Sequence, residues 1–163
     1  MALKAKMMGR AALMRRLNEL APMAEEYAAE AKLEVVKEAA NLISAAAPFD
    51  TGDYMSKIKG ERQADNPNHA PVVGQKSKDP DATAVYAPFI WRFLEFGTKA
   101  SAGESPRPDR RYKSGKIMTA GKRAHAATPA IPHVFPTWNE FKPRAKRTIN
   151  AAINRAVREV RGR

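Results

Sequence analysis

The sequence predicts an α+β fold in which a small antiparallel sheet packs with two or three helices. Three segments indicate this fold class. Residues 1–47 form a long helical region, residues 48–98 contain short strand-like runs and one short helix, and residues 131–163 form a C-terminal helix. Residues 99–130 form an extended basic loop between them. The length predicts a single domain over residues 1–163.

The composition restricts both the core and the partners. Aromatic residues make up 7% of the chain, so Ala, Leu, Ile, Val and Met must supply most of the packing, and association between subunits would add core. The formal net charge is +12, which predicts acidic neighbours such as nucleic acid or an acidic protein surface. The chain has no Cys, which excludes disulfides, thiolate metal sites and a cysteine nucleophile.

The N-terminal region predicts two successive helices. Apolar residues fall near helical spacing over residues 3–20, and Pro22 predicts a break before a second helix that ends near Ala46. Polar residues interrupt the first 20 positions, so no signal peptide is predicted. No window approaches the roughly 20 apolar residues of a membrane span, and we expect a soluble protein without a membrane partner.

Four glutamates repeat every four residues along the second predicted helix and form an acidic stripe. They are Glu26, Glu30, Glu34 and Glu38. Like charges at this spacing destabilise an isolated helix by about 0.2–0.5 kcal/mol per pair. The stripe is therefore either a solvated face or a surface that lies against basic residues of this chain or of another subunit.

A turn and three short strands are predicted after this helix. Asp50, Thr51 and Gly52 form a turn signature, because Asp bonds backbone N–H groups ahead of it and Gly tolerates positive φ. An aspartic protease needs two such carboxylates, and no second Asp-Thr-Gly or Asp-Ser-Gly occurs. Turn residues separate the strand candidates, which suggests an antiparallel meander of residues 54–63, 72–73 and 82–86.

Residues 86–98 are the densest apolar and aromatic stretch, and we expect them to pack between sheet and helices. Pro88 can start a short helix, and Gly97 is placed to end it. Helical spacing puts four residues on one side of this helix: Phe89, Arg92, Phe93 and Phe96. Glu95 lies within this run. A buried catalytic acid is one interpretation; a residue in an ion pair or at a subunit boundary is the favoured one.

The extended loop carries the largest excess of positive charge. Between residues 107 and 123 there is one acid, Asp109, against seven basic residues: Arg107, Arg110, Arg111, Lys113, Lys116, Lys122 and Arg123. A loop of this length in a small domain is usually functional or disordered. It can neutralise DNA phosphates or order as an arm on a neighbouring subunit, and we favour the second.

No catalytic or metal-binding pattern is found. His69, His125 and His133 are scattered, without metal-ligand spacing or a nucleophile elbow nearby. No helix-turn-helix or zinc-finger pattern occurs. We expect no enzyme activity and no cofactor.

Three short motifs in order resemble a known family. Residues 47–52 close a helix with a proline-x-aspartate-threonine-glycine turn, residues 86–98 contain a tyrosine-alanine pair and a glutamate-phenylalanine-glycine-threonine segment, and residues 128–136 lead through proline and phenylalanine into the last helix. This order resembles the HK97 gp10-like family of tailed-phage neck, head–tail joining and tail-completion proteins. The motif residues that match the family are Asp50, Thr51, Gly52, Tyr86, Phe96, Gly97, Thr98 and Phe135.

The resemblance implies a structural virion protein, assembled in the bacterial cytoplasm, that forms a ring in the neck of the phage. The ring is expected to be sixfold and to contact the connector or stopper and the tail tube, with incidental contact to packaged DNA left open. Interface residues are then expected in the glutamate stripe, at Glu95 and in the basic loop. The alternative that the charge supports is a basic, nucleoid-type protein that binds double-stranded DNA.

Overall fold

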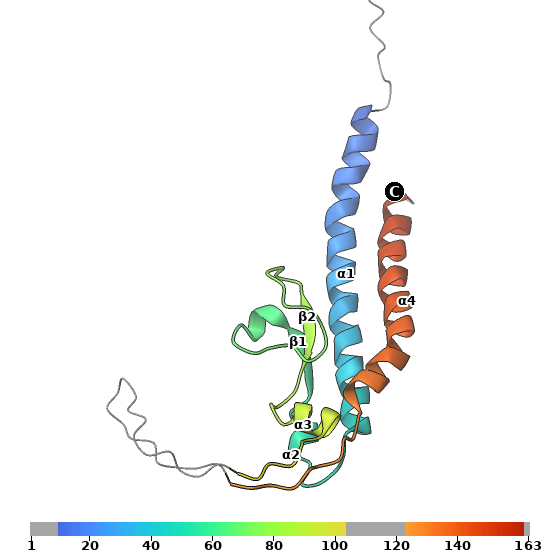
Figure 1. Ribbon diagram of the computed structural model, residues 1–163. Helices are drawn as coiled ribbons and strands as arrows, with labels where there is room; N and C mark the ends of the chain where they lie inside the picture. Colours follow the sequence, from blue (N-terminus) through green and yellow to red (C-terminus); the bar gives the residue numbers. More distant parts are fainter. Residues whose placement is uncertain (1–9, 104–122, 162–163) are drawn as a thin grey trace, which may run out of the picture. The chain divides into compact units, whose positions relative to one another are not determined.

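The computed structural model describes residues 10–103 and 123–161 of the chain. Within these residues it has four α-helices and a two-stranded antiparallel sheet, which confirms the predicted α+β fold with long N- and C-terminal helices (Figure 1). The chain divides into two units, one of Met1–Pro88 with Val134–Arg163 and the other of Phe89–His133. The single domain stays a prediction.

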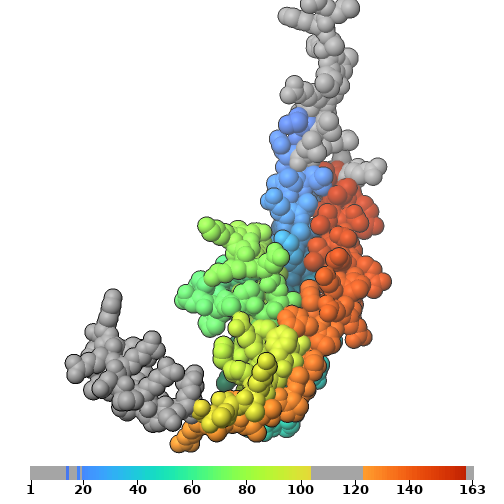
Figure 2. All heavy atoms as spheres, in the orientation of Figure 1, coloured from blue at the N-terminus to red at the C-terminus, as the bar shows by residue number. Residues whose placement is uncertain are grey.

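The first unit is built around the long helix α1 (Arg10–Ala46), which contacts both the sheet and the C-terminal helix α4 (Val134–Arg161). The two helices run antiparallel and lie side by side (Figures 1 and 2). Six alanines of these helices are buried: Ala29, Ala31, Ala39, Ala40, Ala145 and Ala156. Small side chains let helix axes approach closely, so an alanine-rich chain can build a dense core with few aromatics.

The predicted break at Pro22 is wrong, because α1 continues through this residue. Proline removes one intrahelical hydrogen bond, the one that its missing N–H would donate to Asn18. Both residues are exposed, so water can solvate the freed carbonyl, and strong helix formers follow on the C-terminal side. The first predicted helix, residues 3–20, begins outside the described residues.

The sheet pairs β1 (Lys59–Arg62) with β2 (Thr83–Tyr86) in antiparallel register, with Gly60 opposite Val85. Val73 bridges the other side of Val85, which is fully buried, so the strand predicted at residues 72–73 is reduced to one isolated bridge. The strand predicted over residues 54–63 is wrong in its first half. A short helix, α2 (Asp53–Ser56), stands there, and a 3-10 turn (Gln63–Asp65) follows β1.

Gly60 sets how closely the sheet approaches α1. A Cβ atom at this position would lie 2.2 Å from the backbone oxygen of Val36, which no real contact permits. The glycine therefore lets the main chain of β1 lie directly on the main chain of α1.

The second unit contains the short helix α3 (Trp91–Phe96) and the described ends of the basic loop. Isolated bridges pair Thr98 with Thr128 and Ser101 with His125, so the loop leaves and returns as a narrow antiparallel ribbon. The prediction that the aromatic stretch packs in the core is wrong for most of its large side chains. Those that are exposed are Phe89, Ile90, Phe93 and Phe96.

Candidate interaction surfaces

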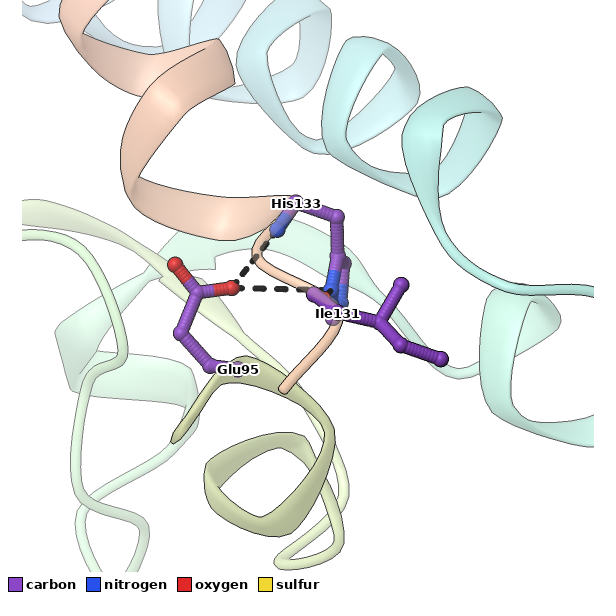
Figure 3. A network of polar contacts seen from close by, with 3 residues as sticks. All are labelled: Glu95, Ile131 and His133. Carbon is purple, nitrogen blue, oxygen red and sulfur yellow. Dashed lines mark hydrogen bonds and ion pairs between the residues drawn. The ribbon is translucent and has the colours of Figure 1, made fainter. Parts of the chain in front are cut away.

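Glu95 and His133 form a buried polar contact within the second unit (Figure 3). Glu95 is 3% exposed and accepts a 2.8 Å hydrogen bond from the backbone N–H of His133. The Nδ1 atom of His133 lies 2.8 Å from the carbonyl oxygen of Ile131 and 3.5 Å from the same carboxylate. Both neighbours are acceptors, so Nδ1 carries the hydrogen and donates it to Ile131.

This contact joins the two ends of the second unit. The backbone N–H of Ile131 donates to the carbonyl of Leu94, so the chain just before α4 is bonded to α3 through both main chain and side chain. Of the roles that the sequence leaves open for Glu95, its burial and its hydrogen bond to the backbone fit the structural one. We interpret Glu95 as the residue that fixes the base of the loop.

Gly97 and Thr98 start the ribbon that carries the basic loop. Gly97 ends α3 with φ at 69°, as predicted for a helix stop, and a Cβ there would lie 2.5 Å from the carbonyl oxygen of Thr128. The backbone groups of Thr98 and Thr128 exchange two 3.0 Å hydrogen bonds. Of the predicted basic residues, Arg123 is exposed, and the others lie outside the described residues: Arg107, Arg110, Arg111, Lys113, Lys116 and Lys122.

Four large apolar side chains of α3 and of the turn before it are exposed, and we call them the aromatic face: Phe89, Ile90, Phe93 and Phe96. Arg92 is exposed beside them, with its guanidinium 5.6 Å from the centre of the Trp91 ring. The rings of Phe89 and Phe93 meet edge-to-face at 5.4 Å. Their exposed fractions are 70% and 45%, and that of Phe96 is 65%. The helix thus has its polar Glu95 inside and its phenylalanines outside. The sequence shows that these aromatics share one side of a helix. It does not show that this side is exposed, because a helix with aromatics on one side and a carboxylate on the other normally buries the aromatics.

The glutamate stripe lies along α1, where Glu26, Glu30 and Glu34 are exposed and Glu38 is half-buried. Arg144 of α4 forms a 2.9 Å ion pair with Glu38. Glu38 therefore meets a basic residue of its own chain, whereas the contact predicted for the stripe as a whole stays a prediction. An exposed pair contributes about 0–1 kcal/mol, so it fixes helix orientation more than it stabilises the fold.

A second polar contact joins the other end of the two helices. The Tyr27 hydroxyl donates a 2.7 Å hydrogen bond to Glu159, whose carboxylate also accepts from Arg155 at 3.3 Å. The hydrogen bond to Glu159 is the main cause that raises the pKa of Tyr27. The Arg155 guanidinium lies 5.6 Å from the centre of the Tyr27 ring. The contact fixes the register of α4 on α1.

The turn of residues 47–53 projects an aromatic side chain from the end of α1. Phe49 is 79% exposed, and Asp50, Thr51 and Asp53 are also exposed. Gly52 has φ at 83°, and the backbone N–H of Ser56 donates to its carbonyl to begin α2. The positive φ predicted for Gly52 is therefore confirmed, whereas the hydrogen bond of the Asp50 side chain to the backbone stays a prediction. The exposure of Phe49 could not be predicted from the turn signature.

The remaining motif residues lie inside the first unit. Tyr86 ends β2 opposite Lys59 and is buried; burial, with smaller contributions from Glu61 and Asp65, raises the pKa of its hydroxyl. Phe135 lies in the first turn of α4 and is half-buried.

An apolar groove of ≈ 240 Å³ lies in the first unit between α1, α4 and the loop that precedes β2. Its apolar lining includes Val35, Val36, Trp138 and Ile149. Three lysines also line it: Lys32, Lys142 and Lys146. The described lining contains no acidic residue. No sequence pattern predicts the groove, because its lining residues come from segments far apart in the chain.

In the part of the chain that the structure describes, no group of three His, Cys, Asp or Glu side chains is placed to hold a metal ion. No described helix is long and apolar enough to cross a membrane.

Comparison with known proteins gives one match. A family model named HK97-gp10_like, described as "Bacteriophage HK97-gp10, putative tail-component", matches residues 11–97, more than half of the chain. The match spans the turn at residues 47–52 and residues 86–97 of the second motif, and it ends before Thr98 and the third motif at residues 128–136. No curated protein and no solved structure matches the chain.

Proposed function

Because the chain belongs to the HK97-gp10-like family, whose description is that of a phage tail component, we propose that it forms a ring in the neck of a tailed bacteriophage. In this position the ring, expected to be sixfold, completes the tail and joins it to the head connector. The protein acts by geometry, since each subunit presents surfaces that neighbours and the adjoining rings cover.

The aromatic face of α3 is the observation that carries this proposal. Exposed apolar clusters of this kind mark protein interaction sites, because leaving them in water costs about 25 cal/mol for each Å² of apolar surface. Phe93 and Phe96 are exposed on α3, and the ring of Phe89, in the turn before the helix, meets that of Phe93. Glu95 of the same helix is buried and bonded to the backbone of His133. A rigid apolar face is suited to binding a partner, since little ordering is needed on association.

The glutamate stripe supports the same function through charge. Glu26, Glu30 and Glu34 are exposed on α1, while the chain as a whole carries a net charge of +12. Opposite charges on different surfaces of one subunit favour association of copies in one orientation. Reversing Glu30 and Glu34 to Lys is expected to impair ring assembly, measured by particle mass; unchanged assembly would remove the stripe from the interface.

The decisive experiment examines the particles. A nonsense mutation in the gene for this chain is expected to give separate filled heads and tails, or tails of abnormal length, in electron micrographs of the lysate. The parent gene supplied in trans should restore joined particles, whereas the Phe89→Ser/Phe93→Ser/Phe96→Ser variant should not. Normal particles in the nonsense mutant would overturn the proposal.

A basic DNA-binding protein is the competing function, which the net charge supports. It predicts a shift of duplex DNA by the purified protein that weakens steeply with salt, because bound phosphates release counterions. The ring proposal predicts instead a discrete multiple of the subunit mass in the absence of DNA.

A further inference from the structure

We propose that the lysine-lined groove of one subunit receives the Phe49 turn, residues 47–53, of a second copy of this chain. The inference rests on the proposed ring and names the contact between neighbouring subunits that would close this ring. The contact involves two surfaces that each subunit carries on its first unit: the groove between α1 and α4, and the turn that follows α1.

The two surfaces match in shape. The groove of ≈ 240 Å³ has an apolar lining that includes Val35, Trp138 and Ile149. A cavity of about 150 Å³ accommodates a benzene ring, so the groove is large enough for a phenyl side chain. Phe49 is 79% exposed, the largest exposed fraction among the large apolar side chains that the structure describes.

The two surfaces also match in charge. Lys142 and Lys146 are exposed at the groove, and no acidic residue is among its described lining. On the turn, the exposed Asp50 and Asp53 follow Phe49 by one and four positions, and residues 47–53 contain no basic residue. An inserted phenyl ring would therefore bring two carboxylates toward two ammonium groups at the rim, where such pairs mainly determine orientation and choice of partner.

A second copy is the occupant because the turn does not fill the groove of its own chain. Phe49 is exposed, and the turn follows Ala46, about 15 Å along α1 from Val36 at the groove. Ser44 holds the turn at the end of α1, since its hydroxyl donates to the carbonyl of Met55 at the end of α2. Contact between two different surfaces of identical chains is heterologous, and repeated contacts of this kind close into a ring or extend as a filament.

Disulfide cross-linking tests the contact directly, because the chain has no native Cys. Asp50→Cys protein is mixed with Lys146→Cys protein under mild oxidation, and covalent dimers are quantified by gel. The matched control is Ala151→Cys, an exposed position on the opposite side of α4. We expect about tenfold more dimer with Lys146→Cys than with Ala151→Cys, since a disulfide needs Cα atoms within about 7 Å. Equal yields would overturn the inference.

Charge reversal tests it in the chain without added cysteines. Lys142→Glu/Lys146→Glu and Asp50→Lys/Asp53→Lys are each expected to weaken self-association about tenfold, and a mixture of the two variants should recover most of the loss. The control is Arg147→Glu/Arg158→Glu, which changes the same number of charges on the opposite side of α4. Phe49→Ala should weaken association without changing the midpoint of urea unfolding. Failure of the mixture to recover association would contradict the contact.

The outcomes separate this inference from the proposed function. If the parent forms a ring at the phage neck but neither cross-linking nor charge reversal depends on the groove, the ring stands and the contact is wrong. If the cross-link is specific but phage particles assemble without the protein, the contact stands and the neck function is wrong. Binding of duplex DNA that is lost in Lys142→Glu/Lys146→Glu, with no specific cross-link, would assign the groove lysines to DNA instead.

Discussion

In the unit built on α1 and α4 the buried side chains are mostly alanines and β-branched residues, whereas in the unit of residues 89–133 a glutamate is buried and three phenylalanines are exposed. The first unit follows the ordinary rule that apolar residues lie inside. The second reverses it on one short helix, and the reversal is stabilised by hydrogen bonds to Glu95 and by backbone pairing in the ribbon.

The difference between the units shows that the largest apolar side chains of this protein are not the most buried ones. Ala39, Ala40 and Ala156 are at most 2% exposed because close helix packing leaves no room for larger side chains. A phenylalanine buries far more area than an alanine, so its exposure is the larger loss for an isolated subunit. An assembly in which partners cover α3 removes that loss, which is why the comparison bears on function.

Truncating one phenylalanine in each unit should give the largest contrast. Phe141→Ala, at a position only 5% exposed on α4, is expected to lower the free energy of unfolding by about 3–5 kcal/mol. Phe96→Ala, at a position 65% exposed, should change it by less than about 0.5 kcal/mol. Urea unfolding followed by far-ultraviolet circular dichroism measures both. Similar losses for the two variants would contradict the assignment of α3 as an exposed face.

Gly60→Ala tests how closely the sheet lies on α1. The added Cβ would meet the main chain of Val36, which cannot rotate away, so the sheet must shift. We expect a loss of about 3 kcal/mol, the upper part of the range for overpacked sites. Lys59→Ala, the exposed neighbour on the same strand, is the control and should be nearly neutral. A neutral Gly60→Ala would mean that β1 does not touch the α1 backbone.

Two substitutions at Glu95 test whether the residue stabilises the fold as a hydrogen-bond acceptor or through its charge. Glu95→Ala leaves the buried N–H of His133 without this acceptor, at a cost of about 1–3 kcal/mol, whereas Glu95→Gln retains an oxygen at the same position and should cost less. Hydrogen exchange at the His133 amide reports the effect locally, with faster exchange expected in the alanine variant. Equal exchange rates in both variants would show that the bond to the carboxylate oxygen is not what protects this amide.

The sequence predicted the local elements that depend on local chemistry. The end of α1 near Ala46, the strand β2, the short helix after Pro88 and the stop at Gly97 all follow from propensity, turn residues and positive φ. Their positions agree with the structure because each depends on a few neighbouring residues.

Features that depend on tertiary contacts were not predicted. The alternation of Tyr54, Ser56 and Ile58 suggested a strand, but Gly52 and Asp53 begin a helix there that Ser44 holds in place. The pairing of Thr98 with Thr128 joins residues thirty positions apart and has no local signature. For the same reason the sequence placed the aromatics of α3 inside, since periodicity identifies a face of a helix but not what covers it.

The smallest expected effect concerns Tyr86, at the buried end of β2 in the first unit. Burial raises the pKa of its hydroxyl above the ordinary value of 10.0. Above pH 10 the unfolded chain therefore releases this proton while the folded chain retains it, so the free energy of unfolding falls as the pH rises through the folded pKa. Tyr86→Phe has no hydroxyl to titrate, so this part of the decrease in the free energy of unfolding is absent. The slope of the free energy of unfolding against pH should then be shallower above pH 10 than in the parent.

The measurement is urea unfolding of parent and variant at several values between pH 8 and 11, compared as a difference because lysines titrate equally in both. Tyr27 also has a raised pKa, caused mainly by its hydrogen bond to Glu159, so the comparison is repeated with Tyr27→Phe in both chains. If the free energy of unfolding of the parent and of Tyr86→Phe changed with pH at the same rate, a buried hydroxyl at the end of β2 would be contradicted. A shallower slope would support the contrast between the units, since burial in the first unit is the largest cause that raises the pKa of Tyr86, ahead of Glu61 and Asp65.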